Sequence, residues 1–282
     1  MPASPAPGWY DDPRQRGQGR YWDGTSWTPW IATGRGMELD PEPPGPVADA
    51  RTPLPFSAVG WALLGVFVGV VLSVALSVLT GLMTDSLAIE LLVGQAGLYV
   101  GILWAIVWVC RRYRTGRVRD DLVVHWRGVD VGIGLIGSIA CRVGAGVLVI
   151  VALAVLGGDA DDAAPEQFER FETSDLARVV IAVIAVCAAP VVEELLFRGV
   201  LLRALRGPLG RIGAIAVQAT AFGLLHVDWS GHWEQGVTLF IATAALGVGS
   251  AVLVEMTGRL APSIWTHAWF NLVSSIVILW GI

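Results

Sequence analysis

The sequence has few charged residues and no lysine. Charged residues make up 15% of the 282 positions, against about a quarter in an ordinary soluble domain. All 19 basic residues are arginine, and the net charge of −5 argues against a nucleic-acid-binding protein. With 54% hydrophobic residues and a mean hydropathy of +0.62, the composition excludes a disordered chain, a coiled coil and a typical soluble enzyme. It indicates a membrane protein.

Cysteine is scarce as well. Cys110, Cys141 and Cys187 each lie in an apolar run, and none belongs to a C-x-x-C motif. An odd number without that spacing supports neither a disulfide framework nor a cysteine metal site. The first 50 residues contain no apolar stretch of the kind found in signal peptides, so no cleaved signal is expected.

The composition changes abruptly near Phe56. Residues 1–36 are rich in tryptophan, since residues 8–31 alone contain four of the thirteen in the chain. This region predicts a small cytoplasmic domain. Residues 37–55 are rich in proline and acidic residues, which is typical of an extended linker. Residues 56–282 predict an all-α polytopic membrane domain. Seven runs have the roughly 20 mostly apolar residues that a transmembrane helix needs: about 56–82, 87–110, 129–156, 177–203, 209–227, 235–257 and 260–281.

Arginine marks every second connection between these runs. The Arg-rich connections follow the second, fourth and sixth runs, whereas residues 83–86 contain no arginine and 157–176 are acidic. Positively charged loops stay in the cytoplasm. The sequence therefore predicts an integral plasma-membrane protein with a cytoplasmic N-terminus and an external C-terminus.

Two adjacent carboxylates interrupt the fourth run. A charged side chain at mid-bilayer costs about 2.5–3.5 kcal/mol, so Glu193 and Glu194 must face the bundle interior. Glu194 and Arg198 are four residues apart and can pair on one helix face. Glu193 points about 100° away from Glu194. Pro190 is expected to loosen the helix beside them.

Histidines occupy two other runs. Phe222 and His226 are four residues apart in the fifth run, and His267 and Asn271 are four apart in the seventh. A single histidine in an apolar helix is more often a packed core residue than a catalyst, and an interior Glu–Arg pair can be purely structural. One shared interior site with Glu193 accounts for all these costly polar groups together.

Three further polar residues have no predicted role. His125 and His232 lie in polar loops. Arg142 lies in the middle of the third run, where it could pair within the bundle or extend toward the headgroups, and the sequence leaves both open.

The three polar stretches resemble the motifs of the CPBP family of intramembrane proteases, which includes the eukaryotic CAAX prenyl endopeptidase and bacterial Abi-type proteins. The family has a Glu-Glu-x-x-x-Arg helix, a Phe-x-x-x-His helix and a His-x-x-x-Asn helix. These stand here, in the same order, as Glu193–Arg198, Phe222–His226 and His267–Asn271. The resemblance covers roughly residues 175–275.

The N-terminal region resembles a short bacterial domain of unknown function. Asp23-Gly24 lies between aromatic flanks and predicts the tight turn of a small β-hairpin unit. Four aromatic residues are its predicted core: Trp9, Tyr10, Trp22 and Trp27. A unit of this size buries little surface and could bind a cytoplasmic partner.

The family resemblance implies an intramembrane endopeptidase that hydrolyses peptide bonds of membrane-embedded or membrane-anchored substrates. Glu193 would activate the water, and His226 would help to hold it. His267 and Asn271 would donate to the oxyanion. Three other motif residues would support the site: Glu194, Arg198 and Phe222.

Alternatives remain at two levels. Glu193, His226 and His267 could instead ligate a catalytic Zn²⁺, as in a metalloprotease. The H-E-x-x-H motif of zinc proteases is missing, so no cofactor is favoured, although zinc stays possible. At the level of function, the alternative is a non-proteolytic membrane protein of the same fold, such as a bacteriocin-immunity or assembly factor. A transporter or proton relay is a third, because intramembrane Glu and His also mark ion paths.

Overall fold

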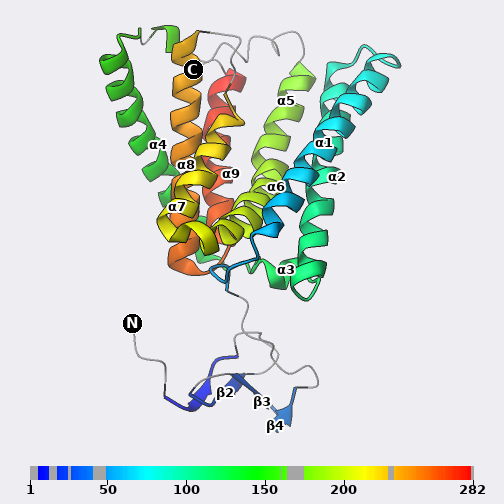
Figure 1. Cartoon of the computed structure of the whole chain (residues 1–282), viewed down its shortest axis with the longest axis vertical. Helices are drawn as coiled ribbons and strands as arrows, with labels where there is room; N and C mark the ends of the chain where they lie inside the picture. The colour runs from blue at the N-terminus through cyan, green and yellow to red at the C-terminus, as the bar shows by residue number, and fades with distance from the viewer. Residues whose placement is uncertain are drawn as a thin grey trace. The chain divides into compact units, whose positions relative to one another are not determined.

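The computed structural model describes residues 6–12, 18–24, 27–40, 49–159, 161–163, 175–227 and 232–280 (Figure 1). The chain divides into two compact units, Met1–Asp49 and Ala50–Ile282. The first is built from strands and the second from helices, which confirms the predicted fold class.

The N-terminal unit is a four-stranded antiparallel sheet in the order β1-β2-β3-β4. Its strands are β1 (Gly8–Tyr10), β2 (Gly19–Trp22), β3 (Trp27–Thr33) and β4 (Gly36–Leu39). Asp23 and Gly24 directly follow β2 in its connection to β3, and Gly24 has a φ of 99°. The sheet is larger than a hairpin and extends past the predicted boundary at residue 36, because β4 pairs with β3.

Charged residues occupy the centre of this sheet unit. Arg20 is fully buried, and its Nε lies 2.9 Å from Asp12 Oδ1 while its Nη2 pairs with Asp40. Burial alone would lower the pKa of Arg20, but the hydrogen bonds to both carboxylates outweigh it and raise the pKa. The predicted aromatic core is wrong for Trp9 and Tyr10, which are 43% and 40% exposed. Aromatic contacts are still present, because the Trp27 ring lies 5.3 Å from the Trp22 ring and 6.2 Å from the Tyr10 ring, centre to centre.

Five helical stretches in the described part of the chain are long and apolar enough to cross a membrane. Four of them are single helices: α1 (Ser57–Gly81), α2 (Leu87–Tyr113), α4 (Val129–Leu156) and α8 (Trp233–Thr257). The fifth, Asp175–Leu224, contains the fourth predicted span and all but the last three residues of the fifth, which was predicted to end at residue 227. A break at Gly210, with φ 67° and ψ −178°, separates the two spans. The seventh predicted run forms α9 (Ala261–Trp280).

The Asp175–Leu224 stretch changes its helical type along its length. It begins with α5 (Asp175–Val183), the π-helical segment η3 (Ile184–Ala188) and α6 (Ala189–Glu194). A second π-helical segment, η4 (Leu195–Leu201), leads into α7 (Leu202–Leu224). α5 and α6 lie between the α1–α2 pair and α9, with α8 and α4 on the far side of α9 (Figure 1). This places the two carboxylates of α6 inside the bundle.

The Arg-rich connections lie together at one end of the bundle. Arg203 donates to the backbone carbonyl of Asp121 at 2.7 Å, next to the short helix α3 (Val118–Asp121). Arg259 Nη1 lies 2.7 Å from Asp130 Oδ2. Burial lowers the pKa of His125 in the same region, against the opposite effect of Asp120. These contacts agree with the predicted alternation of loops.

Candidate active site

The helix that carries the two glutamates is irregular on both sides of them. Glu193 and Glu194 end α6, between π-helical segments η3 and η4. Pro190 lies near the start of α6, immediately after the first segment, as its missing N–H predicts. π-helical insertions shift the register of a helix and occur frequently at functional sites. Here they decide which faces the two adjacent carboxylates present.

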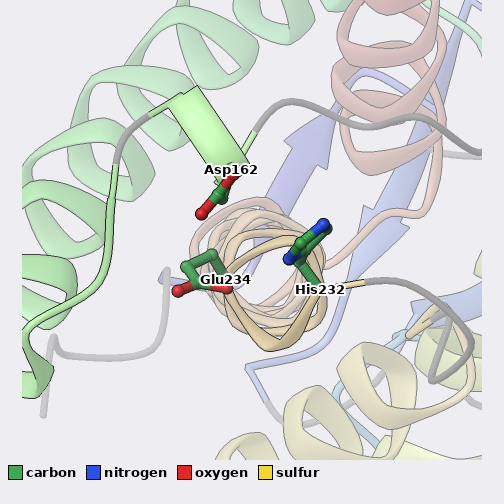
Figure 2. A group of neighbouring side chains, drawn as sticks. All are labelled: Asp162, His232 and Glu234. Atoms are coloured by element: carbon green, nitrogen blue, oxygen red, sulfur yellow. The ribbon is translucent and has the colours of Figure 1, made fainter.

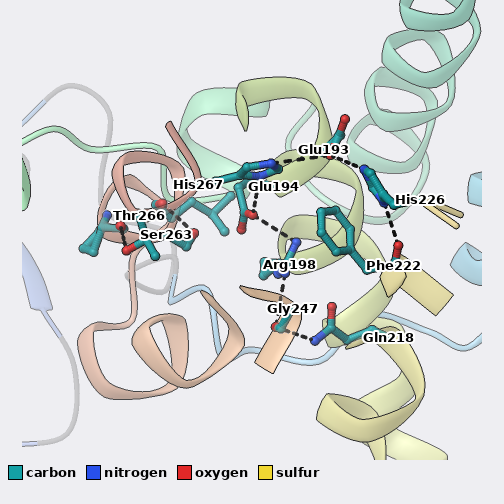
Figure 3. Close-up of polar contacts among 12 residues, drawn as sticks. Glu193, Glu194, Arg198, Gln218, Phe222, His226, Gly247, Ser263, Thr266 and His267 are labelled. Atoms are coloured by element: carbon teal, nitrogen blue, oxygen red, sulfur yellow. Dashed lines mark hydrogen bonds and ion pairs between the residues drawn. The ribbon is translucent and has the colours of Figure 1, made fainter. Parts of the chain in front are cut away.

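Glu194 is the centre of a fully buried polar network (Figure 3). Its Oε1 lies 2.9 Å from Arg198 Nη1, which confirms the predicted pair on one helix face. The same oxygen lies 3.1 Å from Nδ1 of His267 on α9. One carboxylate therefore links the α6–η4 segment to α9 and fixes the orientation of the His267 ring.

Glu193 lies between the imidazoles of His226 and His267 (Figure 3). Its Oε2 lies 3.7 Å from His226 Nε2 and 3.8 Å from His267 Nε2. This oxygen is buried and has no hydrogen-bond partner, although the side chain as a whole is 20% exposed. Glu193, His226 and His267 are thus brought together, as the sequence predicts.

The outer ring nitrogens of the two histidines are both held by acceptors. His226 Nδ1 lies 2.7 Å from the carbonyl oxygen of Phe222, and His267 Nδ1 faces the Glu194 carboxylate. Both contacts favour the tautomer with the proton on Nδ1, because an imidazole must donate to an oxygen acceptor. The Nε2 atom of each ring then points toward Glu193, where it accepts a hydrogen bond if the ring is neutral and donates one if the ring is protonated.

Phe222 packs against both histidine rings, and two residues that the sequence analysis did not single out, Gln218 and Gly247, lie beside Arg198. The Phe222 ring lies 4.5 Å from the His226 ring and 5.6 Å from the His267 ring, centre to centre. Arg198 Nη2 donates to the Gly247 carbonyl of α8 at 3.1 Å, and Gln218 Nε2 donates to the same oxygen at 3.0 Å. Gln218 is fully buried in α7, a burial that the isolated glutamine in an apolar run could have indicated.

Asn271 contacts the backbone of the glutamate helix. Its Nδ2 donates to the Ala185 carbonyl at 2.7 Å. In η3 the Ala189 N–H bonds to Ile184 O, and the next N–H in that register would come from Pro190, which has none. The Asn271 amide therefore supplies the donor that proline removes. The structure gives this residue a positioning role beside the predicted oxyanion role.

Arg142 pairs within the bundle, which was one of the two predicted outcomes. Its guanidinium lies 4.2 Å from the centre of the Phe270 ring, and Nη2 donates to the Phe270 carbonyl and, at 2.9 Å, to Ser274 Oγ. All three contacts are on α9. They bring a charged residue of α4 against the helix that carries His267.

The ligand atoms of Glu193, His226 and His267 do not all lie within 4.8 Å of one another, although Glu193 Oε2 is within 3.8 Å of both histidine Nε2 atoms. Ligands of a tetrahedral zinc ion lie about 2.0–2.2 Å from the metal and thus close to one another. Among the described residues, the His/Cys/Asp/Glu group whose ligand atoms all lie within 4.8 Å of one another is a different one: Asp162, His232 and Glu234. The Oε2–Nε2 distances of 3.7 and 3.8 Å allow a bridging water and are also close to the separation of two ligands of one zinc ion.

Comparison with known proteins agrees with this arrangement. Residues 175–273 match the family model described as type II CAAX prenyl endopeptidase Rce1-like. That range includes all the motif residues from Glu193 to Asn271. Residues 7–48 match the model of a protein of unknown function, DUF2510. Both resemblances inferred from the sequence are confirmed. Neither the curated proteins nor the solved structures gave a match to the chain.

Proposed function

We propose that this chain is an intramembrane endopeptidase in which Glu193 acts as the general base. The match of residues 175–273 to the Rce1-like model supports a CAAX-type protease at the level of the family. The apolar helices support a multi-pass membrane protein. The observation that carries the finer assignment is the buried, unpartnered Oε2 of Glu193, which faces two imidazole nitrogens.

The distances around Glu193 suit a bound water. The gaps of 3.7 and 3.8 Å exceed a direct hydrogen bond, but a bridging water spans such a separation. The water would donate one proton to Glu193 and the other to the Nε2 lone pair of His226. Its oxygen lone pairs would then be free to attack the carbonyl carbon of a peptide bond.

The reaction uses Glu193 twice. As the water oxygen bonds to the carbonyl carbon, its proton passes to Glu193, and the carbonyl becomes an oxyanion. His267, in its protonated form, would donate from Nε2 to that oxyanion, with Glu194 stabilising the imidazolium through Nδ1. The C–N bond then breaks, and the proton on Glu193 passes to the leaving amine.

The remaining motif residues act through these groups. Arg198 balances the charge of Glu194, and Phe222 holds both histidine rings in place. Asn271 enters the proposal as a positioning residue, because its amide donates to the Ala185 carbonyl. The substrate class we propose is a peptide segment that is embedded in or anchored to the membrane.

The experiment compares new peptide termini in membranes of cells that express the wild-type chain or Glu193→Gln. Loss of a general base costs about 10²–10⁴-fold, so the termini should disappear in this variant at equal expression. Glu90→Gln, which changes a glutamate outside the site, should keep them. Unchanged termini in Glu193→Gln would refute the assignment. If cells with Glu193→Gln retain the phenotype of cells with the wild-type chain, a non-proteolytic role is favoured.

Metal dependence needs a separate measurement on the purified chain. We expect cleavage to persist after treatment with a chelator, because the proposed chemistry uses only side chains and water. Stoichiometric zinc that is removed together with activity, and that Glu193→Gln fails to bind, would instead favour the metalloprotease alternative.

A further inference from the structure

A second cluster of ligating side chains shares no residue with the proposed catalytic site (Figure 2). Asp162 belongs to the short 3-10 helix η1 (Asp161–Ala163) after α4. His232 is the N-cap residue of α8, and Glu234 lies in the first turn of that helix. Although η1 and α8 are distant in sequence, one ligand atom from each residue lies within 4.8 Å of the others.

Glu234 is the residue that requires an explanation. It is only 6% exposed, and its Oε2 is buried without a hydrogen-bond partner. A buried carboxylate is costly unless a cation or hydrogen-bond donors compensate it. The helix dipole favours a negative charge at the N-terminal end of α8, but it does not provide a hydrogen-bond donor for Glu234 Oε2. Asp162 adds a second negative group on the same side, which increases the cost.

The chain just before the cluster contacts the first residue of α8. A Cβ atom on Gly158 would lie 2.8 Å from the Trp233 ring, so the end of the α4 connection touches the start of α8 directly. Asp162 and His232 are exposed, whereas Glu234 is buried beneath them. An ion can therefore arrive from solvent and meet a ligand that is already in place.

We propose that Asp162, His232 and Glu234 form a binding site for a divalent transition-metal ion, with zinc as its probe. Two carboxylates and one imidazole suit a borderline ion such as Zn²⁺ better than Ca²⁺ or Mg²⁺, which prefer oxygen ligands alone. Two carboxylates would balance the charge of the ion. Three protein ligands leave one position for water. The bound ion would fasten η1 to the start of α8.

The experiment measures zinc bound to the purified full-length chain, without a polyhistidine tag, by equilibrium dialysis with elemental analysis. The wild type should bind zinc at this site. Glu234→Gln and His232→Gln should weaken binding by more than the ~10–100-fold that loss of an outer-shell partner costs. Glu90→Gln is the matched control, because Glu90 also lies in the first turn of a long helix and should leave zinc binding unchanged.

Two results would overturn the proposal. One is zinc affinity that is equal in the wild type, Glu234→Gln and His232→Gln. The other is zinc that is lost in Glu193→Gln and retained in both ligand variants, which would place the ion at the peptidase site. Asp162→Asn, which changes an exposed ligand, gives a third test if the Glu234 variant fails to fold. Circular dichroism and a monodisperse elution profile verify folding of each variant.

Discussion

Two arginines inside the helical bundle differ in the groups that face them. Arg198 is fully buried and lies 2.9 Å from the carboxylate of Glu194. Arg142 contacts a backbone carbonyl, a serine hydroxyl and the face of Phe270, and the described contacts give it no carboxylate partner. Replacing each arginine with methionine should therefore change the free energy of unfolding by different amounts.

We predict that Arg198→Met lowers the free energy of unfolding by about 3–5 kcal/mol, because it leaves the Glu194 charge buried and uncompensated. Arg142→Met should change that free energy much less, since it removes a costly charge and leaves no ion behind. Denaturant unfolding in micelles, followed by helical circular dichroism, measures both. Equal losses in the two variants would contradict this account. The double variant Glu194→Leu/Arg198→Met should recover part of the loss.

Sequence spacing predicted one of these arginine environments and not the other. Glu194 and Arg198 are on one helix at the spacing of neighbours, so local geometry sufficed. The partners of Arg142 are on α9, 128 and 132 residues further along the chain. Only the packing of α4 against α9 decides between an interior contact and the headgroup region. Residue spacing carries no information of that kind.

At the scale of a helix, the hydrogen bond to the Ala185 carbonyl couples Pro190 to Asn271. Ala189 N–H bonds to Ile184 O, and the missing N–H of Pro190 leaves Ala185 O to the Asn271 side chain. A buried carbonyl without a donor costs about 1–3 kcal/mol. Pro190 of α6 therefore leaves a backbone acceptor in η3 that Asn271 of α9 satisfies.

The prediction is a double-mutant cycle at these two positions. Asn271→Ala alone should destabilise the fold by about 1–3 kcal/mol. Pro190→Ala restores a backbone N–H, so adding it to Asn271→Ala should recover much of that loss in unfolding measurements. Pro262→Ala, at the start of α9, is the matched control and should recover nothing. Strictly additive effects of Pro190→Ala and Asn271→Ala would show that the two residues are not coupled.

The α1–α2 pair depends on glycines that allow the two backbones to touch. Gly65 and Gly69 form a G-x-x-x-G pattern on α1, as do Gly97 and Gly101 on α2. A Cβ on Gly101 would lie 2.3 Å from the Gly69 nitrogen, and a Cβ on Gly69 would lie 2.4 Å from the Leu98 carbonyl oxygen. Small residues of this kind are typical of helix contacts in membranes.

We predict that Gly69→Leu lowers the thermal stability of the purified chain and reduces its monodisperse fraction. The added side chain must force the helices apart, and overpacking costs about 1–3 kcal/mol or more. Gly60→Leu on the same helix is the control, because a Cβ there meets nothing within 4 Å. If both variants lose stability equally, the cause is helix propensity or insertion and not the close contact.

The hydropathy of the sequence predicted where the long helices lie, but it did not predict that two of them are continuous or where the helix becomes irregular. The predicted runs 56–82 and 129–156 correspond closely to α1 (Ser57–Gly81) and α4 (Val129–Leu156). The fourth and fifth runs form one helical stretch with a break at Gly210, because glycine there adopts a left-handed φ. The π-helical segment η3 lies beside a proline and a long-range contact from Asn271, and hydrophobic periodicity alone cannot place a segment of this kind.

At the scale of the whole molecule, the two units solve the burial of charge differently. In the helical unit Glu194 and Arg198 are buried as a pair at the proposed site, and further buried charges, such as Asp130 and Arg203, lie at the Arg-rich end of the bundle. In the sheet unit Arg20 joins Asp12 and Asp40, and the aromatic residues Trp9 and Tyr10 remain largely exposed. The aromatic composition of this unit indicated an aromatic core. A short sequence does not reveal which side chains of a sheet are buried, so the prediction failed for these two residues.

The orientation of the chain in the membrane is the remaining prediction at this scale. Contacts such as Arg203 with Asp121 and Arg259 with Asp130 gather the Arg-rich connections at one end of the bundle. Arginine-rich connections are retained in the cytoplasm, so this end should be cytoplasmic and the turn after α1 external. Replacing the three native cysteines gives a background for labelling: Cys110, Cys141 and Cys187.

In that background, Met83→Cys should react with a membrane-impermeant maleimide in intact cells, because Met83 is 78% exposed in the turn between α1 and α2. Gly128→Cys lies just before α4 in the Arg-rich connection and should react only after the membrane is permeabilised. A Cβ at Gly128 meets nothing within 4 Å, so the substitution leaves the packing intact. Reversed labelling would invert the orientation, place the N-terminal sheet outside the cytoplasm and bring the Asp162–His232–Glu234 cluster to the cytoplasmic side.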